Sequence, residues 1–367
     1  MERELLELYS DYLLSSFSYT TATGLSIMTE GEISHDKVTR FLSSGDYTSK
    51  ELWKIVKPTI REIEDKKGGI VAIDDTIEEK PYTEENEIVN WYHDHSKGRS
   101  VKGINIVSAL YINDKGKIPL DFSIVKKTKT IYDEKRGKER RISEVANDSV
   151  CGVTKNQLYQ KMLNQIVKNK VQFKYVLNDV WYSSAENMVQ VKKKLVKEFI
   201  MPIKSNRKIA MSREDMIYGK YATVSLLDLK EDTIYKIYIE DVPFALYLAM
   251  QQFKNEDGTK GVLYLVTSDK KLTYKDITEF YQKRWKIEVY HKSLKKNTSL
   301  CKSPARMVRT QSNHVFASIF AFYKLECLSM KVKINHFAIK ARIYEKAIKV
   351  AYEELQQVHQ LSFEFAK

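Results

Sequence analysis

The sequence predicts a mixed α/β protein, with a β-rich core and helical segments attached to it. Two short apolar runs, GGIVAID and FKYVLND, each stop at an acidic residue. Such a run is typical of a buried strand whose end reaches a functional site. Around these runs the pattern is β-β-β-α-β-α-β, followed by further β-rich segments and then helices. This order is that of a mixed α/β core with attached elements.

Residues 1–66 are expected to be helical. Ser34 suits the position before a helix, and Thr48 is followed by Glu51 at the spacing of a capping box. Short helices that carry Lys and Arg make this segment a candidate DNA-binding element. A plain packing role explains the same residues equally well.

Residues 67–205 are expected to form the first part of the core. A strand at 69–74 is followed by two β-rich runs separated by the turn sequence NDKG, which predicts an antiparallel hairpin. Leu158, Met162 and Ile166 stand at helical spacing in the next segment. The remaining elements of this part are expected to be a strand at 173–179, a helix at 183–199 with a serine cap, and a strand at 199–205.

The rest of the chain is divided at its changes of pattern. Residues 206–270 are again β-rich and are expected to be an inserted subdomain. Residues 271–322 are expected to complete the core, and they begin with one long basic helix at 273–297. Residues 323–367 are expected to form a helical C-terminal region with apolar i, i+3, i+4 spacing.

The charge of the chain favours a polyanionic partner. The sequence has 61 Lys and Arg against 48 Asp and Glu, a formal net charge of +13. Nucleic acid is the first expectation and an acidic membrane surface the second, although such a charge also serves solubility. The basic residues are spread over many segments, which favours a folded DNA-binding surface over a disordered basic arm.

The three cysteines, Cys151, Cys301 and Cys327, are too few and too scattered for a disulfide framework or a zinc site. A reducing cytoplasm is the expected location. The N-terminus lacks the plan of a signal peptide, and the longest apolar stretch, 315–323, is too short to span a bilayer. The sequence therefore predicts no membrane association.

Acidic residues at strand ends are the first candidates for chemistry. Asp74 and Asp179 end the two apolar runs, and ligand sites of α/β sheets gather where strand ends meet. Asp75 competes with Asp74, because successive strand residues point to opposite faces of a sheet. Taken alone, either aspartate is more simply a turn former or a helix cap.

A third acid lies on the expected basic helix. Tyr281, Arg284, Glu288 and Lys295 fall at i, i+3, i+7 and i+14, within an arc of about 60° on a continuous helix. Such a face can present a carboxylate to a metal while its basic neighbours bind phosphates. A solvated helix stabilised by ion pairs is the competing interpretation.

The run Tyr281-QK-Arg284-WKI-Glu288-VYHKSL-Lys295 resembles the Y-(2)-R-(3)-E-(6)-K signature of the insertion sequence four family of bacterial transposases. Asp74-Asp75-Thr76 resembles the D-x-T of the first strand of an RNase H-like core, which favours Asp74 over Asp75. Asp179-Val-Trp-Tyr182 likewise resembles the D-x-x-Y that ends the fourth strand. The resemblance covers residues 69–322.

The resemblance implies an RNase H-like core with a β-rich insertion between the second Asp and the Glu. It implies that Asp74, Asp179 and Glu288 hold two Mg²⁺ ions, for which Mn²⁺ can substitute. Tyr281, Arg284 and Lys295 are then expected to contact DNA phosphates. Family members often stack a flipped base on a tryptophan, for which Trp181 and Trp285 are candidates by proximity, although packing explains both more simply.

The implied function is cut-and-paste transposition in a bacterial cytoplasm, in association with the nucleoid. The expected partners are double-stranded DNA, as inverted-repeat ends and target, and a second copy of the chain as a homodimer on DNA. Two alternatives stay open: a transposon-end-binding protein without catalysis, and another RNase H-like nuclease. The presence of all three acids argues against the first alternative, and the Tyr-Arg-Glu-Lys set argues against the second.

Overall fold

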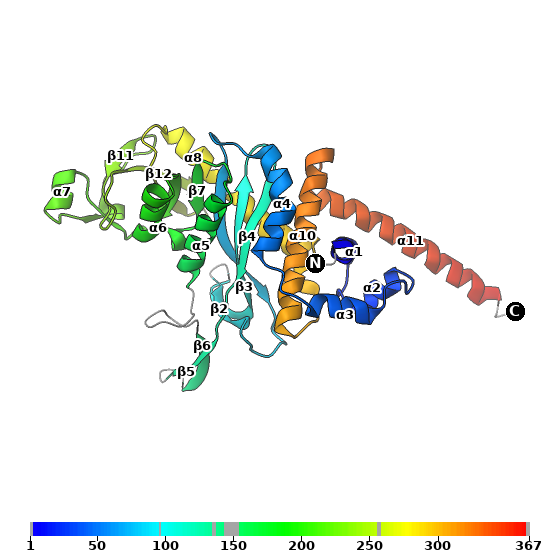
Figure 1. Cartoon of the computed structure of the whole chain (residues 1–367). Coiled ribbons are helices and arrows are strands. Elements are labelled where there is room, and N and C mark those ends of the chain that lie inside the picture. The colour runs from blue at the N-terminus through cyan, green and yellow to red at the C-terminus, as the bar shows by residue number, and fades with distance from the viewer. Residues whose placement is uncertain (1–2, 95–96, 134–136, 143–153, 255–257, 365–367) are drawn as a thin grey trace. The chain divides into compact units, whose positions relative to one another are not determined.

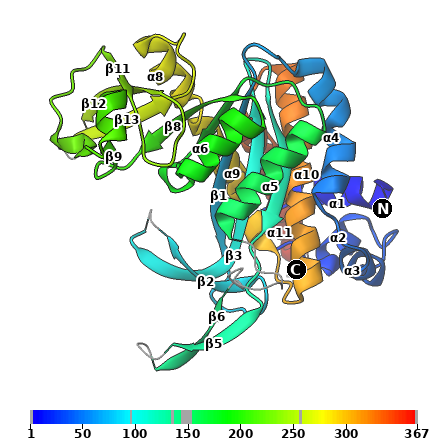
Figure 2. The ribbon, with the colours of Figure 1, turned by 60° about the vertical axis from the view of Figure 1, so that its left-hand side comes forward.

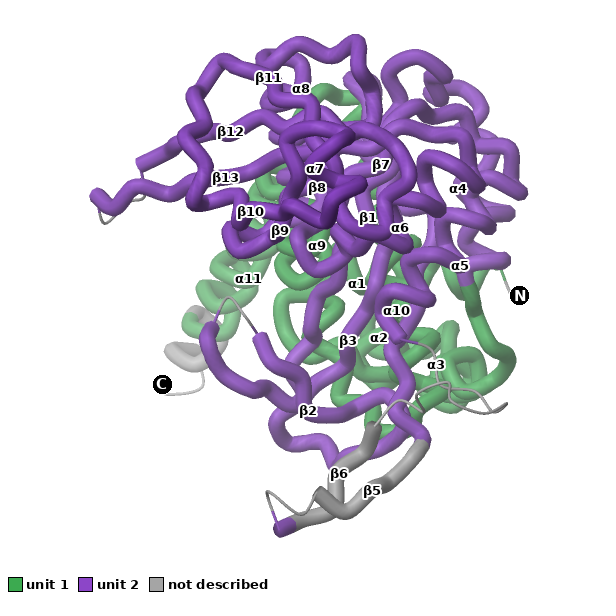
Figure 3. The backbone as a smooth tube through the Cα atoms, turned by 90° about the vertical axis from the view of Figure 1, so that its left-hand side faces the viewer, with its two compact units in different colours: residues 1–48, 290–367 green, residues 49–289 purple. Residues whose placement is uncertain are grey.

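The computed structural model describes residues 3–94, 97–133, 137–142, 154–254 and 258–364. The chain divides into two compact units (Figure 3). One comprises residues 49–289, and the other comprises residues 1–48 together with 290–367. Within the described residues, no helix is long and apolar enough to cross a membrane.

Residues 49–289 are built on a mixed sheet, which has nine strands within the described part of the chain. The strand order is β11-β12-β13-β8-β7-β1-β3-β2, and β4 also pairs with β3. The sheet strands are β1 (Ile70–Glu79), β2 (Val89–Asp94), β3 (Arg99–Ile112), β4 (Lys117–Ile124), β7 (Tyr175–Asn178), β8 (Glu198–Ile203), β11 (Ile234–Ile237), β12 (Leu246–Lys254) and β13 (Lys260–Thr267). Two short ribbons are β5 (Lys129–Asp133) with β6 (Lys138–Ile142) and β9 (Lys208–Ile209) with β10 (Ala222–Thr223).

The centre of the sheet combines antiparallel and parallel pairing. β3 and β4 form the antiparallel hairpin expected from the NDKG turn, and β3 pairs antiparallel with β1. β7 lies parallel to β1, and β8 lies parallel to β7. The prediction of a mixed α/β fold is thus confirmed.

The helices of this unit follow from amphipathic segments with polar caps. They are α4 (Ser49–Ile63), α5 (Lys155–Lys168), α6 (Ala185–Val189), α7 (Arg213–Ile217), α8 (Tyr274–Gln282) and the start of α9 (Trp285–Asn297), with 3₁₀ turns Val180–Tyr182 (η1) and Val224–Leu226 (η3) and a π-helical turn Gln190–Lys194 (η2). Thr154 and Gln157 form a capping box at the start of α5. Of the three apolar residues expected on one face, Met162 and Ile166 are buried and Leu158 is half-buried. Figure 2 shows α5 and α6 in front of the sheet strands.

The stretch 206–270 contains the strands expected there, but they do not form a sheet of their own. β13 pairs antiparallel with β8, and β12 and β11 follow in order, so the central sheet simply continues into this stretch. The stretch belongs to the same compact unit as the core.

The other unit is helical. It contains α1 (Arg3–Ser15), α2 (Ala22–Met28), α3 (His35–Ser43), the end of α9, the turn Leu300–Lys302 (η4), α10 (Val308–Val332) and α11 (His336–Glu364), several of which are labelled in Figure 1. α10 is buried along most of its length because it packs against α1, α3 and α11. The hydroxyl of Tyr9 lies 2.9 Å from Nδ1 of His314, which joins α1 to α10 inside this core.

Residues 3–63 form four helices with short connections, as predicted for this segment, and Ser34 caps α3 by accepting a hydrogen bond from the backbone of Lys37. The boundary of this segment differs from the prediction. α4 packs against β4 and belongs to the unit of the sheet, whereas α1 to α3 belong to the helical unit. Cys301 and Cys327 are not part of a disulfide in the described part of the chain, and Cys151 lies outside the described residues.

The prediction of one continuous helix over 273–297 is wrong. α8 ends at Gln282 and α9 begins at Trp285. Between them, the backbone N–H groups of Lys283 and Arg284 bond to carbonyls three residues back instead of four. Lys283 keeps helix-like dihedral angles, so the apolar periodicity passes through the break and does not reveal it.

Candidate catalytic site

The register of two central strands brings two aspartates together. β1 and β7 are parallel, and Ile73 lies opposite Asn178 at the end of their pairing. The next residues of the two strands are Asp74 and Asp179, which therefore stand side by side where β7 ends. Their carboxylates are close enough for electrostatic repulsion.

The expectation that the first strand stops at Asp74 is wrong. β1 continues to Glu79, because β3 is long enough to pair with every residue from Ile70 onward. Asp74 instead marks the point at which β1 loses its parallel partner. Asp74 therefore lies where one neighbouring strand, β7, ends while the other, β3, continues to pair with β1.

Asp75 is held in place by three donors. Its carboxylate accepts hydrogen bonds from Lys155 at 2.6 Å, Asn105 at 2.8 Å and Tyr182 at 2.9 Å. Burial opposes ionisation of Asp75, but Lys155 and the hydrogen bonds outweigh it and lower the pKa of this carboxyl. The negative charge of Asp75 is therefore balanced by Lys155 and by hydrogen bonds from Asn105 and Tyr182.

The pKa of Asp74 is shifted in the opposite direction. Burial, together with repulsion from Asp75 and Asp179, raises the pKa of Asp74 to about 7, although Arg284 and a backbone hydrogen bond oppose the rise. Oδ1 of Asp74 accepts this bond from the N–H of Asp75 at 2.8 Å. Two adjacent aspartates thus have pKa shifts of opposite sign, which is a feature of functional sites.

Arg284 connects Asp74 to Glu288. Its guanidinium donates to Glu288 at 2.6 Å and lies 3.5 Å from the carboxylate of Asp74. Burial disfavours the charged guanidinium, but Tyr281, Glu288 and Asp74 together raise the pKa of Arg284. The side chain of Arg284 is 15% exposed, so this cation lies largely inside the site.

The remaining signature residues have different surroundings. Tyr281 is nine-tenths buried, and its hydroxyl donates to the backbone oxygen of Asn178 at 3.4 Å. The guanidinium of Arg284 lies over the Tyr281 ring, 5.6 Å from its centre. Lys295 is partly exposed in the last turn of α9, in the part of that helix that belongs to the helical unit.

Both candidate tryptophans are exposed. Trp181 lies in η1 and is 51% exposed, and Trp285 is the first residue of α9 and is 62% exposed. Asp179 caps η1 by accepting a hydrogen bond from the N–H of Val180 at 2.6 Å, so Trp181 is two residues from the acid.

A groove of about 680 Å³ opens beside the acids. Asp179, Tyr281 and Arg284 form part of its lining, and Phe253 and Leu263 contribute apolar surface. One of the two strand-end acids, Asp179, and the pair Tyr281 and Arg284 thus line the same groove.

Carboxylates at this point in the sheet are suitable ligands for a hard divalent cation. Asp74 and Asp179 repel each other, and oxygen ligands are those that Mg²⁺ prefers. Across the described part of the chain, no group of three or more His, Cys, Asp or Glu side chains is spaced to hold a metal ion. Glu288 is linked to Asp74 through Arg284, and a cation has to compete with that guanidinium for both carboxylates.

Sequence reasoning missed part of this site. Lys155 and Asn105 hold Asp75, yet neither stands in a motif or at a spacing that marks it. Tyr182 stands in the D-x-x-Y motif, but its hydrogen bond to Asp75 depends on the pairing of β1 with β7. Only the three-dimensional structure shows these contacts, because the partners are separated by 30 or more residues.

Two family models match the chain. Residues 1–220 match the family described as DDE superfamily endonuclease, and residues 149–323 match the family described as transposase DDE domain. The first range contains Asp74 and Asp179, and the second contains Asp179 and Glu288. No curated protein matches the chain in sequence.

Three solved structures show distant likeness. An endonuclease V from Bacillus subtilis has 11% identity and a TM-score of 0.25, over 76% of this chain and 95% of that one. The NurA nuclease from Sulfolobus solfataricus has 10% identity and a TM-score of 0.27, over 84% of this chain and 92% of that one. The Drosophila P element transposase strand transfer complex has 8% identity and a TM-score of 0.28, over 91% of this chain and 81% of that one.

Proposed function

The chain belongs to the DDE superfamily endonucleases, and we propose that it is a DNA transposase that cuts and joins the ends of an insertion sequence by a cut-and-paste route. We assign the catalytic carboxylates to Asp74, Asp179 and Glu288. The observation that carries this proposal is the side-by-side position of Asp74 and Asp179, with Glu288 joined to Asp74 through Arg284.

The arrangement of the first two aspartates supports Asp74 as the ligand and Asp75 as its support. Asp75 already has three donors, whereas Asp74 faces Asp179 and carries the raised pKa. Asp74, Asp179 and Glu288 would hold two Mg²⁺ ions, with Mn²⁺ able to substitute. When bound, the ions would supply activation of a water or a DNA 3′-OH and stabilisation of the leaving oxygen.

The chain's own residues then bind and orient the DNA. Arg284 is the cation nearest the acids, and its fork of N–H groups suits a phosphate of the strand that is cut. The ring of Tyr281 contacts the guanidinium of Arg284 and helps to hold it in position. The hydroxyl of Tyr281 in turn donates a hydrogen bond to the backbone of β7. We assign Lys295 to a more distant phosphate, from its place in the signature.

The order of the central strands supports an RNase H-like core. β4, β3 and β1 form an antiparallel set, and β7 and β8 then continue parallel to β1. Under this proposal, the stretch 206–270 is the β-rich insertion between Asp179 and Glu288, and it joins the edge of the core sheet. The signature residues support membership of the insertion sequence four family.

The proposed partners are the inverted-repeat ends and target DNA, in the bacterial cytoplasm at the nucleoid, with the chain acting as a homodimer. α11 supports the homodimer. Ala341, Tyr344, Ile348, Ala351, Leu355 and Val358 repeat at alternating spacings of three and four along this helix. Tyr344, Ile348, Leu355 and Val358 are about half-exposed. Under this proposal, the heptad row would form the seam of a coiled coil with the same helix of a second copy.

Cleavage of DNA that carries the element's own flanking sequences tests the proposal. The wild type is expected to cut at the element ends in Mg²⁺ and to join the 3′ ends to a second DNA, whereas Glu288→Gln is expected to bind the ends without cutting. Glu279→Gln, an exposed acid on α8, is the matched control and is expected to cut normally. Cutting at random positions without joining would instead identify a general nuclease. Tight binding of the ends by the wild type without cutting would identify an end-binding protein.

A further inference from the structure

Helix α5 contacts both of the strands that carry the assigned aspartates. Successive residues of β1 point to opposite faces of the sheet, so Asp75 points away from the face of Asp74. On the Asp75 side, Lys155 at the start of α5 donates to this carboxylate at 2.6 Å. One turn further along α5, the hydroxyl of Tyr159 donates at 3.0 Å to the side-chain oxygen of Asn178, the last residue of β7. A single helix thus reaches the residues next to both acids.

Tyr182 joins the two strands directly. It lies in η1, the turn that follows Asp179, and its hydroxyl donates to Asp75 at 2.9 Å. The N–H of Tyr182 donates to the carbonyl of Asp179 at 3.0 Å, so this turn is closed by its own backbone. Burial and the charge of Asp75 raise the pKa of Tyr182, so its hydroxyl keeps its proton at neutral pH and remains a donor. The turn after β7 is therefore hydrogen-bonded to β1 through one side chain.

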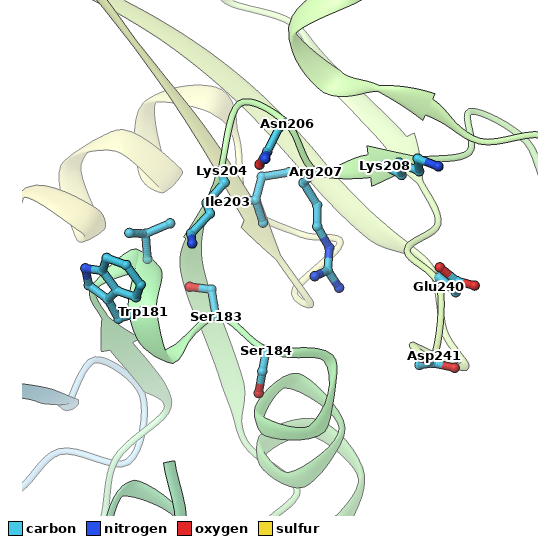
Figure 4. Close-up of a pocket in the computed structure, with 11 residues that line it drawn as sticks. Trp181, Ser183, Ser184, Ile203, Lys204, Asn206, Arg207, Lys208, Glu240 and Asp241 are labelled. Atoms are coloured by element: carbon cyan, nitrogen blue, oxygen red, sulfur yellow. The ribbon is translucent and has the colours of Figure 1, made fainter. Parts of the chain in front are cut away.

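The neighbours of Tyr182 restrict its movement. Tyr182 is 1% exposed, and its ring stacks on that of Tyr159, with 5.3 Å between the ring centres. Its backbone carbonyl accepts a hydrogen bond at 2.9 Å from the buried amide of Asn187 in α6. Ser183, which directly follows η1 in Figure 4, accepts a hydrogen bond from Asn178 at 3.0 Å. A buried polar network whose members are hydrogen-bonded in this way is rigid.

The two aspartates lie just beyond the backbone pairing of their strands. The parallel pairing of β1 with β7 stops at Ile73 and Asn178, so no pairing of the two strands holds Asp74 and Asp179 together. Their carboxylates repel each other, which favours a wider separation when no cation is bound. The hydrogen bond from Tyr182 lies past the last backbone pair and opposes this separation.

We propose that Tyr182 and Lys155 are positioning residues that act through Asp75. Tyr182 holds the end of β7 against β1 directly, and Lys155 does so through α5. Together they keep Asp74 and Asp179 at the spacing that a shared metal ion requires. The inference rests on the proposed function, and it gives a role to two residues to which that function assigns no contact with metal or DNA. Ligands that are already held in place bind a metal more tightly, because less freedom is lost on binding.

Binding of Mn²⁺ tests the proposal independently of cleavage. The full chain is titrated with MnCl₂ without DNA, and electron paramagnetic resonance measures the free Mn²⁺. The variants are Tyr182→Phe, which removes one hydroxyl and keeps the stacked ring, and Lys155→Met, which removes the cation and keeps the length of the side chain. Asp74→Asn is the reference for loss of a metal ligand. The Mg²⁺ concentration that gives half-maximal cleavage of the element ends is measured in parallel.

Each variant has a matched control. Tyr111→Phe also removes the hydroxyl of a fully buried tyrosine in the same compact unit, one that accepts a hydrogen bond from the N–H of Asp65 at 2.7 Å. Lys161→Met removes an exposed cation from α5. Urea denaturation in EDTA verifies that variants and controls are folded and compares their free energies of unfolding.

We expect Tyr182→Phe and Lys155→Met each to weaken Mn²⁺ binding by roughly tenfold, the usual effect of removing a support of a metal ligand. The Mg²⁺ concentration for half-maximal cleavage should rise by about the same factor, and excess Mg²⁺ should restore most of the rate. Tyr182→Phe should bind duplex DNA in EDTA like the wild type. Both controls should keep the Mn²⁺ affinity of the wild type, even where Tyr111→Phe lowers the free energy of unfolding.

The proposal is overturned if Tyr182→Phe and Lys155→Met bind Mn²⁺ as tightly as their controls do. It is also overturned if Tyr111→Phe weakens Mn²⁺ binding as much as Tyr182→Phe does, because the loss would then follow general stability. Failure of the proposed function gives a different pattern. In that case Asp74→Asn binds Mn²⁺ like the wild type, and the assignment of the metal ligands falls together with that of their supports.

Discussion

The guanidinium of Arg284 lies 3.5 Å from the carboxylate of Asp74 and donates to Glu288 at 2.6 Å. One cation thus neutralises two of the three acids that are assigned to metal binding. Arg284 does not form an ion pair with Asp179, and the negative charge of Asp179 repels that of Asp74. The site therefore combines excess negative charge with a cation that a divalent metal has to displace.

Asp74→Asn is expected to abolish cleavage and to stabilise the metal-free protein. Removing one of three adjacent negative charges relieves repulsion, and we expect the free energy of unfolding at pH 8 to rise by about 1–3 kcal/mol. Urea denaturation in EDTA measures this change. An unchanged or lower stability would contradict the charge balance described for Asp74.

Asp75→Asn is expected to act in the opposite direction. It weakens the contact with Lys155 and places an amide N–H₂ group where the carboxylate accepts bonds, which should cost about 1–3 kcal/mol of folding stability. The comparison with Asp74→Asn is well matched, because the two changes are isosteric and adjacent. Equal effects of both changes on stability would show that the two aspartates do not differ as described.

The stability of the metal-free protein should depend on pH through Asp74. Its pKa is about 7 in the folded state, against an ordinary value of 3.8 for the unfolded chain, so the folded state binds the extra proton between these values. The contribution of Asp74 is fully present below about pH 4 and is lost as the pH rises through 7. The stability difference between Asp74→Asn and wild type should therefore grow from about pH 5 to about pH 8, as measured by denaturation in EDTA. A difference that stays constant with pH would contradict the raised pKa.

Arg284→Lys is expected to lower the rate of cleavage by about 10²-fold or more. A single ammonium group cannot bridge Asp74 and Glu288 or bind a phosphate through two N–H groups, so the change is not conservative. Single-turnover cleavage with saturating DNA measures this effect. Lys275→Arg, on the exposed face of α8, serves as a control and should cut normally.

Leu355→Glu is expected to prevent dimer formation if α11 pairs with a second copy. A charge at the heptad seam is buried in the coiled coil but exposed in the monomer. The substitution therefore destabilises the dimer without destabilising the monomer. Light scattering after gel filtration, with and without DNA, measures the mass. Glu353→Gln lies off the seam and should leave the mass unchanged. A wild type that stays monomeric on paired DNA ends would contradict this interface.

Much of this fold was predictable because local patterns reflect it directly. The apolar runs before Asp74 and Asp179 are buried strands, and the NDKG turn joins the hairpin of β3 and β4. Serine caps marked the starts of α3 and α6. These features depend on residues close in sequence, which is why the sequence reveals them.

The break between α8 and α9 and the donors around Asp75 were not predictable. The break changes hydrogen bonding at Lys283 and Arg284 without changing the apolar spacing. Lys155 and Asn105 reach Asp75 only because strand pairing brings distant segments together. Pairing and register are tertiary properties, and no local pattern specifies them.

The most direct test of the central claim is Mg²⁺-dependent cleavage by four single variants: Asp74→Asn, Asp75→Asn, Asp179→Asn and Glu288→Gln. Circular dichroism first verifies that each variant is folded at the assay temperature. We predict that the changes at Asp74, Asp179 and Glu288 each reduce cleavage by about 10³-fold or more, whereas Asp75→Asn keeps measurable activity. Loss of cleavage in folded Asp75→Asn together with normal cleavage by Asp74→Asn would contradict the assignment of the first metal ligand.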